Sequence, residues 1–202
     1  MITLYHAPFS RSVRVLWLLE ELGVPYELRV LPAIAGTTPF SQETPTGKVP
    51  TLEDGALVMF ESIAIMEYLL GRYADGRLAP APDALEWGHF LQWLHYSEST
   101  AFPPLGYVAR HSFALPEHER NAESEKENRV LAASILSVPE RVLGESEYLV
   151  GNRFTAADIA MGYTVGTAKL LGVLDRFPNL DAFLSRLAKR PAFRRATTAP
   201  GA

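Results

Sequence analysis

The 202-residue sequence contains no cysteine. This absence excludes disulfide bonds, cysteine-ligated zinc, iron–sulfur clusters and a thiolate nucleophile supplied by the chain itself. Any sulfur chemistry must therefore come from a ligand. The sequence also lacks a His-Glu-x-x-His motif or another close group of metal ligands, so we predict no metal.

Long apolar runs and an excess of positive charge are missing as well. Residues 1–5 do not form a basic region followed by an apolar stretch, and the apolar run 15–19 is far too short to cross a bilayer. Lys and Arg total 19 against 23 Asp and Glu, and no long basic run is present. We expect a cytoplasmic protein with neither a membrane nor a nucleic acid as partner.

The composition is that of a globular chain, with 48% hydrophobic and 21% charged residues. Up to about residue 73, short β-like runs alternate with helix-like runs, whereas the rest shows mainly helical periodicity. Glycine and proline are frequent in the stretch 76–84, which predicts a linker. We therefore expect one domain over residues 1–75 and an all-helical domain over residues 85–202.

Apolar spacing and turn residues predict the individual elements. The first helix is capped by Ser10 or Ser12 and ends before Gly23. Prolines at 103–104, 139 and 178 are expected to interrupt the helices of the second domain. The remaining predictions are strands at 2–5, 27–31, 51–52 and 56–60, and helices at 61–73, 84–100, 117–136, 155–171 and 180–189.

The segment Gly47-Lys48-Val49-Pro50-Thr51-Leu52 places a proline at the start of a strand. A cis bond before Pro50 would turn the backbone amide and carbonyl of Val49 away from the sheet. These groups could then bind an extended peptide as an added strand. A trans proline in an ordinary loop is the alternative interpretation.

Two further segments place hydroxyl groups at helix starts. Glu61 and Ser62 open the helix that follows the second hairpin strand, where Glu61 could meet a ligand ammonium and Ser62 a carboxylate. Ser10 lies between the first strand and the first helix, where its hydroxyl would face a ligand above the strand ends. Simple helix capping is the alternative for both segments.

Taken in order, these features resemble the soluble glutathione transferase superfamily, especially its bacterial members. The resemblance rests on Tyr5, Ser10, the run Leu-Trp-Leu-Leu-Glu-Glu-Leu-Gly at 16–23, Lys48-Val49-Pro50 and Glu61-Ser62. The segment 151–160 is similar to the capping segment of the family, with Thr155 and Asp158 as a helix-start box. The likeness covers nearly the whole chain.

The resemblance implies an α/β plus all-α fold, in which a thioredoxin-like βαβαββα domain precedes a helical bundle. It also implies that glutathione binds between the two domains as a co-substrate. The Val49 backbone would pair with its cysteinyl unit beside Pro50, and Lys48 would reach its glycyl carboxylate. The γ-glutamyl end would be held by Glu61 and Ser62, and Phe9 belongs to the same implied binding set.

For activation of the glutathione thiol, we predict Ser10 as the hydrogen-bond donor, with Tyr5 as a second candidate. Family members with Ser-Pro-Phe or Cys-Pro-Phe carry their catalytic side chain at the position of Ala7, which can donate nothing. Counting from Tyr5 as in the bacterial beta class places the family cysteine on Ser10 instead. Packing in the core is the alternative role for Tyr5.

The resemblance further implies a homodimer and a second, hydrophobic substrate. Phe102, Tyr107 and Arg110 are the residues predicted to contact this electrophile, with packing or surface exposure as the alternative. Trp87, Phe90 and Trp93 are expected to serve core or dimer packing. The predicted activity is glutathione transfer to small electrophiles. The alternatives are a non-catalytic interaction or regulatory module, or a glutathione-dependent peroxidase or isomerase.

Overall fold

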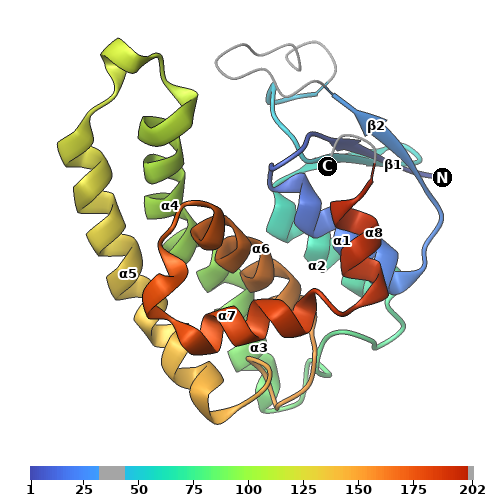
Figure 1. Ribbon diagram of the computed structural model, residues 1–202. Coiled ribbons are helices and arrows are strands. Elements are labelled where there is room, and N and C mark those ends of the chain that lie inside the picture. The colour runs from blue at the N-terminus through green and yellow to red at the C-terminus, as the bar shows by residue number, and fades with distance from the viewer. Residues whose placement is uncertain (32–43, 200–202) are drawn as a thin grey trace. The chain divides into compact units, whose positions relative to one another are not determined.

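The computed structural model describes residues 1–31 and 44–199 (Figure 1). They divide into two compact units. The sheet unit comprises Met1–Ala79 and Ala188–Ala202, and the helical unit comprises Pro80–Leu187. Residues 188–202, which the sequence assigned to the helical domain, therefore belong with the first unit.

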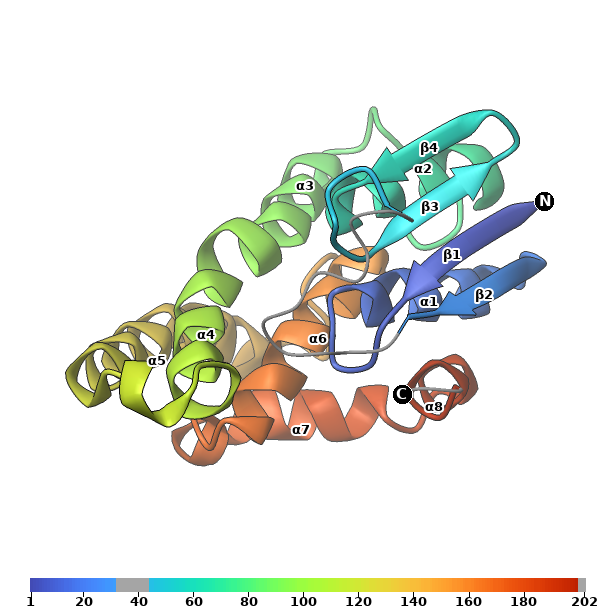
Figure 2. The same cartoon turned by 90° about the horizontal axis from the view of Figure 1, so that it is seen from above.

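The sheet unit is built on four strands in the order β2-β1-β3-β4. Strand β1 is parallel to β2 and antiparallel to β3, and β4 is antiparallel to β3 (Figure 2). The bounds are β1 Ile2–His6, β2 Tyr26–Val30, β3 Thr51–Asp54 and β4 Leu57–Phe60. This is the predicted thioredoxin-like sheet. The helix that the βαβαββα pattern places between β2 and β3 lies outside the described residues.

Helix α1 (Ser12–Leu22) follows β1, and α2 (Ser62–Tyr73) follows β4. As predicted, α1 ends at Gly23, which has a left-handed φ of 68°. Residues 15–19 of α1 are all buried, although a surface helix buries only one stripe. Helix α1 must therefore be covered on more than one side.

The additional cover is α8 (Pro191–Thr197), which lies beside α1 (Figure 1). The rings of Trp17 and Phe193 meet edge to face, with centroids 4.9 Å apart. Arg190 donates two hydrogen bonds to Glu21, at 2.7 and 2.9 Å. These contacts explain why the end of the chain belongs to the sheet unit.

The helical unit is formed by helices of several types. Within the described residues, no helix has both the length and the apolar character needed to cross a membrane. Helix α6 is central to the unit, because most of its residues between 156 and 168 are buried. The elements are α3 Glu86–Tyr96, η2 Ser97–Ala101, α4 Phe102–Ala109, η3 Arg110–Ala114, η4 Glu117–Glu119, α5 Ala122–Glu145, α6 Ala156–Leu170, η5 Leu174–Arg176 and α7 Pro178–Leu187.

The prediction that prolines interrupt these helices was wrong at two of three places. Pro103 and Pro104 lie in the first turn of α4, directly after the π-helical turn η2. Because η2 leads directly into α4 with helical backbone angles at Ala101, the helical path continues through both prolines. Pro139 lies inside α5 and is buried, so packing offsets its missing hydrogen bond. Pro178 begins α7.

The predicted capping box at the start of α6 is confirmed. Asp158 is fully buried and accepts hydrogen bonds from the amide and hydroxyl of Thr155 and from the amide of Leu149. Burial raises the pKa of Asp158 to about 6, although these hydrogen bonds oppose the shift. Asp158 therefore connects the start of α6 to the loop that precedes it.

Candidate functional site

The strand register brings the predicted segments to one end of the sheet. Tyr5 pairs with Thr51, which in turn pairs with Phe60. Strands β1 and β4 therefore end where the antiparallel strand β3 begins (Figure 2). The segments that leave or enter the sheet there are the turn 7–11, Val49–Pro50 and Glu61–Ser62.

The turn between β1 and α1 exposes Phe9 and holds Ser10. The Phe9 side chain is 76% exposed, and its backbone has a left-handed φ of 57°. The Ser10 hydroxyl, which is half-buried, donates to the Ala7 carbonyl at 2.8 Å and accepts from the Ser12 amide at 3.2 Å. The prediction that Ser10 or Ser12 caps α1 was wrong, because Arg11 occupies the N-cap position and makes no side-chain capping hydrogen bond. The Ser10 hydroxyl instead binds the turn that precedes the helix. It remains accessible at the same time.

Ser12 connects this turn to a buried histidine. Its Oγ lies 2.6 Å from Ser10 Oγ and 2.8 Å from His6 Nδ1, and it accepts from the Ala7 amide at 3.2 Å. His6 is fully buried, and burial lowers its pKa to about 4. At neutral pH its imidazole is therefore uncharged. From the sequence, His6 has no predicted role, and Ser12 has none beyond capping.

The Tyr5 hydroxyl makes its hydrogen bonds to other residues than Ser10, Ser12 and His6. The hydroxyl donates to Glu53 Oε1 at 2.9 Å and accepts from Arg29 Nη1 at 3.2 Å. Burial, followed by the hydrogen bond to Glu53, raises the pKa of Tyr5. Because neighbouring strand residues point to opposite faces, this hydroxyl lies on the other face of the sheet from His6. Its proton is already donated within the sheet.

The Val49–Pro50 peptide bond is cis. Among the described residues, no hydrogen bond reaches the backbone amide or carbonyl of Val49, whereas the Lys48 carbonyl accepts from the Thr51 hydroxyl at 3.3 Å. Val49 is half-buried and the Lys48 side chain is exposed. Within the described part of the chain, the segment thus presents an unpaired backbone donor and acceptor beside a cationic side chain.

Glu61 and Ser62 form the start of α2 without capping it through their side chains. Glu61 occupies the N-cap position with φ 72° and ψ 107°, and its side chain makes no capping hydrogen bond. A non-glycine residue in such a conformation carries strain, which is frequent at ligand sites. Within the described residues, the Ser62 hydroxyl has no hydrogen-bond partner. The arrangement suits an anion at the helix N-terminus.

The residues predicted to contact the electrophile differ in their surroundings. Phe102 is 7% exposed and stacks on Tyr163, with centroids 5.6 Å apart, which is a core-packing role. Tyr107 and Arg110 are exposed. Among the three aromatic residues expected in core or dimer packing, Phe90 and Trp93 are buried and Trp87 is half-buried.

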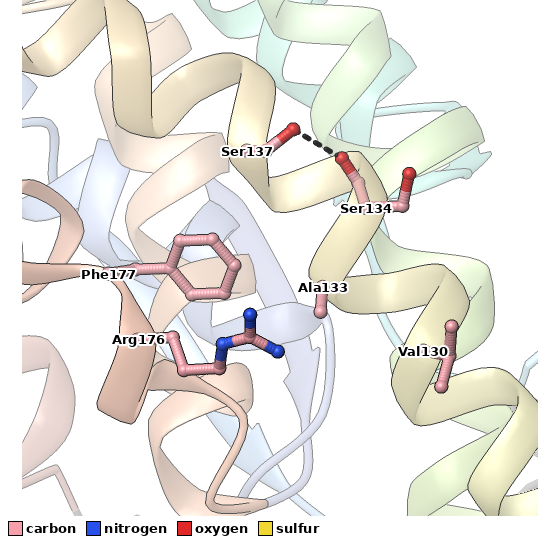
Figure 3. Close-up of a pocket in the computed structure, with 6 residues that line it drawn as sticks. All are labelled: Val130, Ala133, Ser134, Ser137, Arg176 and Phe177. Atoms are coloured by element: carbon pink, nitrogen blue, oxygen red, sulfur yellow. Dashed lines mark hydrogen bonds between the residues drawn. The ribbon is translucent and has the colours of Figure 1, made fainter.

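A cavity of about 320 Å³ lies in the helical unit. Arg176 and Phe177 reach toward α5 there, and the Ser137 hydroxyl donates to the Ser134 carbonyl at 2.6 Å (Figure 3). None of the residues predicted for glutathione or the electrophile lines this cavity. In the described part of the chain, no group of His, Asp and Glu side chains could hold a metal ion.

The four-stranded sheet has a thioredoxin-like topology, and the segments 7–11, 49–50 and 61–62 at its edge form the candidate site. Residues 4–77 match the family model of the glutathione S-transferase N-terminal domain, and residues 104–191 match that of the C-terminal domain. Glutathione S-transferase 3 of Schizosaccharomyces pombe is 30% identical over 96% of this chain and 86% of its own. The chain belongs to the glutathione S-transferase family.

Two further relatives agree with this assignment. A glutathione S-transferase of Hyoscyamus muticus is 32% identical, with 91% of both chains covered. The glutathione transferase URE2P6 of Phanerochaete chrysosporium, solved in complex with oxidized glutathione, is 30% identical. Its structure superposes with a TM-score of 0.85 over 96% of this chain and 94% of that one.

Proposed function

We propose that this protein is a glutathione transferase that conjugates glutathione to small hydrophobic electrophiles. The observation that carries the proposal is the end of the sheet, where the turn that holds Ser10, the Val49 backbone and the start of α2 come together. Among the described residues, the Val49 backbone has no hydrogen-bond partner there. Family membership and the glutathione in the URE2P6 structure support the same ligand. The chemistry needs no cysteine from the chain.

Each part of the tripeptide has a partner of matching chemistry. The Val49 amide and carbonyl pair with the cysteinyl unit as an added strand beside Pro50. The first amides of α2 and Ser62 receive the γ-glutamyl carboxylate, while Glu61 receives the ammonium. Lys48 binds the glycyl carboxylate, and Phe9 provides apolar contact at the same end of the sheet.

Ser10 lowers the pKa of the bound thiol. An unperturbed thiol has a pKa of about 8.5, and lowering it by two units needs about 2.7 kcal/mol. A hydrogen bond to an anion contributes about 1.5–3 kcal/mol, and the N-terminus of α1 adds up to about 2. The thiol proton leaves to solvent. The thiolate then forms a C–S bond with the electrophile as the leaving group departs with its electron pair.

We infer that the helical unit contributes contacts to the electrophile through the exposed Tyr107 and Arg110, and that the protein is a cytoplasmic homodimer acting in detoxification. The buried Phe102 packs in the core instead. The reaction uses no metal. The specific likeness to bacterial members stays a prediction, because the curated relatives named above come from a yeast and a plant.

The test compares Ser10→Ala with Tyr5→Phe as the matched loss of one hydroxyl. We expect Ser10→Ala to lower turnover of an activated aryl halide by about 10-fold to 100-fold, with glutathione affinity retained. Tyr5→Phe should keep its turnover, because its hydroxyl donates to Glu53. Equal turnover of Ser10→Ala and the unsubstituted protein would remove Ser10 from the proposal.

Binding is tested separately by thermal unfolding. Glutathione at one hundred times its Kd should stabilise the folded protein by about 2.7 kcal/mol and raise its Tm. Ophthalmic acid, a glutathione analogue that lacks the thiol, should also raise the Tm, since the recognition groups are the same. An unchanged Tm at millimolar glutathione would contradict the proposed function as a whole.

A further inference from the structure

We propose that His6 is a positioning residue that acts on the glutathione thiolate through Ser12 and Ser10. This inference rests on the proposed function and on the role given there to Ser10. The three side chains form a continuous series of short contacts: His6 Nδ1 to Ser12 Oγ at 2.8 Å, and Ser12 Oγ to Ser10 Oγ at 2.6 Å. It runs from the core to the accessible turn.

The direction of the series follows from the tautomer of His6. Its Nε2 is buried and has no hydrogen-bond partner among the described residues. With the proton on Nε2, the core would contain an unpaired N–H donor, which is rarer and more costly than an unpaired acceptor. The geometry therefore places the proton on Nδ1, where it is donated to Ser12 Oγ.

The next proton is then also determined. Ser12 Oγ accepts from His6 Nδ1 and from the Ala7 amide at 3.2 Å, so both of its lone pairs are used. Its own proton can go to Ser10 Oγ at 2.6 Å or to the Ala7 carbonyl at 3.2 Å. The shorter contact favours donation to Ser10.

Both lone pairs of Ser10 Oγ consequently accept hydrogen bonds, and its hydroxyl has one proton to donate. Its Oγ accepts from the Ser12 hydroxyl and the Ser12 amide, and it donates to the Ala7 carbonyl at 2.8 Å. A bound thiolate is a charged acceptor and attracts this proton more strongly than the carbonyl does. Turning the hydroxyl toward the sulfur exchanges its hydrogen bond to the Ala7 carbonyl for one to the thiolate.

A series of hydrogen bonds in one direction makes the last donor stronger, because each bond polarises the next. A buried leucine would fill the place of His6 without leaving an unpaired nitrogen in the core. The cost of burying Nε2 without a hydrogen-bond partner among the described residues is thus explained by the hydrogen bond that Nδ1 donates. Ser10 supplies the contact to sulfur, while His6 and Ser12 set the direction and strength of that contact.

The decisive measurement is the pKa of the bound glutathione thiol, followed by the ultraviolet absorbance of the thiolate over a pH series. His6→Leu should raise this pKa by about half a unit, which is a roughly threefold fall in the ratio of thiolate to thiol. His6→Asn should restore it, because the asparagine amide nitrogen can take the place of Nδ1. Glutathione affinity measured at low pH should stay unchanged in both variants.

A double-substitution cycle separates this role from a structural one. In a Ser10→Ala background, His6→Leu should leave the thiol pKa where Ser10→Ala alone puts it. An equal shift in both backgrounds, or no shift from His6→Leu alone, would overturn the role of His6. No effect of Ser10→Ala on the thiol pKa would instead overturn the proposed role of Ser10.

A second pair of variants keeps the proposal testable if His6→Leu does not fold. Ser12→Ala removes the middle hydroxyl, and Ser12→Thr retains one. Ser12→Ala should raise the thiol pKa and Ser12→Thr should restore it, with circular dichroism confirming folded protein. The same pKa in Ser12→Ala and Ser12→Thr, both folded, would contradict the proposal.

Discussion

Two fully buried titratable side chains, one in each unit, have pKa values shifted in opposite directions. Burial disfavours the charged form of both, which lowers the pKa of His6 to about 4 and raises that of Asp158 to about 6. The two residues therefore affect stability over overlapping ranges of pH with opposite sign. Single substitutions separate the two contributions.

For His6, the folded pKa lies below the unfolded value of about 6.5, so protons bind preferentially to the unfolded chain. Its contribution to stability is complete above about pH 6.5 and is lost as the pH falls toward about 4. The stability difference between the unsubstituted protein and His6→Asn should shrink by up to about 3 kcal/mol over that range. Urea unfolding at several pH values measures it, and a constant difference would contradict the prediction.

For Asp158, the folded pKa lies above the unfolded value of about 3.9, so the folded protein retains the proton. This contribution is complete below about pH 3.9 and is lost as the pH rises through about 6. Asp158→Asn has no titrating carboxyl group at this position and lacks this pH-dependent contribution. Between pH 4 and 7, the free energy of unfolding of the variant should therefore rise by up to about 3 kcal/mol relative to that of the unsubstituted protein. Parallel stability curves in urea would show that Asp158 does not titrate in this range.

The sequence could predict Asp158 but not His6, for a physical reason. A capping box depends only on residues three apart in the chain, so Thr155 and Asp158 are sufficient to indicate it. The contact of His6 with Ser12 depends on how the turn 7–11 folds back over the end of β1. The conformation of Phe9, with φ 57°, shows that this turn is unusual.

At the scale of elements, α8 is the part that sequence reasoning missed. Only seven residues long, it follows a predicted helix so closely that 180–189 was taken as the last helix. A usable signal was nevertheless present. The five consecutive apolar residues at 15–19 exceed the stripe that a helix covered on one side can bury, which indicates a second covering element.

The ion pairs between α8 and α1 should differ in strength according to burial. Glu21 is only 10% exposed and receives two hydrogen bonds from Arg190, whereas the Arg195 side chain that contacts Glu20 is 55% exposed. Arg190→Ala should therefore lower the free energy of unfolding by about 1–2 kcal/mol, and Arg195→Ala should lower it by less. Denaturant unfolding measures both; a larger loss in Arg195→Ala would contradict this ranking.

In the helical unit, a proline in the sequence does not always end a helix. Proline removes one donor and fixes one dihedral angle, but whether this breaks a helix depends on which neighbours compensate. The π-helical turn η2 before Pro103 and the burial of Pro139 are tertiary features. Local sequence patterns do not contain them.

At the scale of the molecule, the strand order could not be obtained from periodicity, which predicts strands but not their pairing. The resemblance carried by Ser10, Lys48-Val49-Pro50 and Glu61-Ser62 supplied the topology. Strand β4 also exposes apolar side chains, such as Val58 at 48% and Phe60 at 44%. The hairpin pattern predicted the strand but not this exposure.

The proposed homodimer is tested by light scattering. We expect a mass of twice the 22.3 kDa of the chain, because exposed apolar residues such as Leu57, Val58 and Phe60 are covered when two copies associate. Val58→Lys should weaken the association, and Lys48→Ala, which removes an exposed cation from the ligand site, should leave it unchanged. A monomeric mass over the full range of concentrations would contradict the dimer.

The chain leaves the sheet unit after Ala79 and returns to it at Ala188, so the helical unit is an insertion within the sheet unit. During synthesis, the helical unit is therefore complete before the sheet unit, and the apolar face of α1 stays uncovered by α8 until residues 191–197 have been made. A nascent chain stopped at residue 187 would expose Trp17, and a chaperone that binds apolar segments would find its target there.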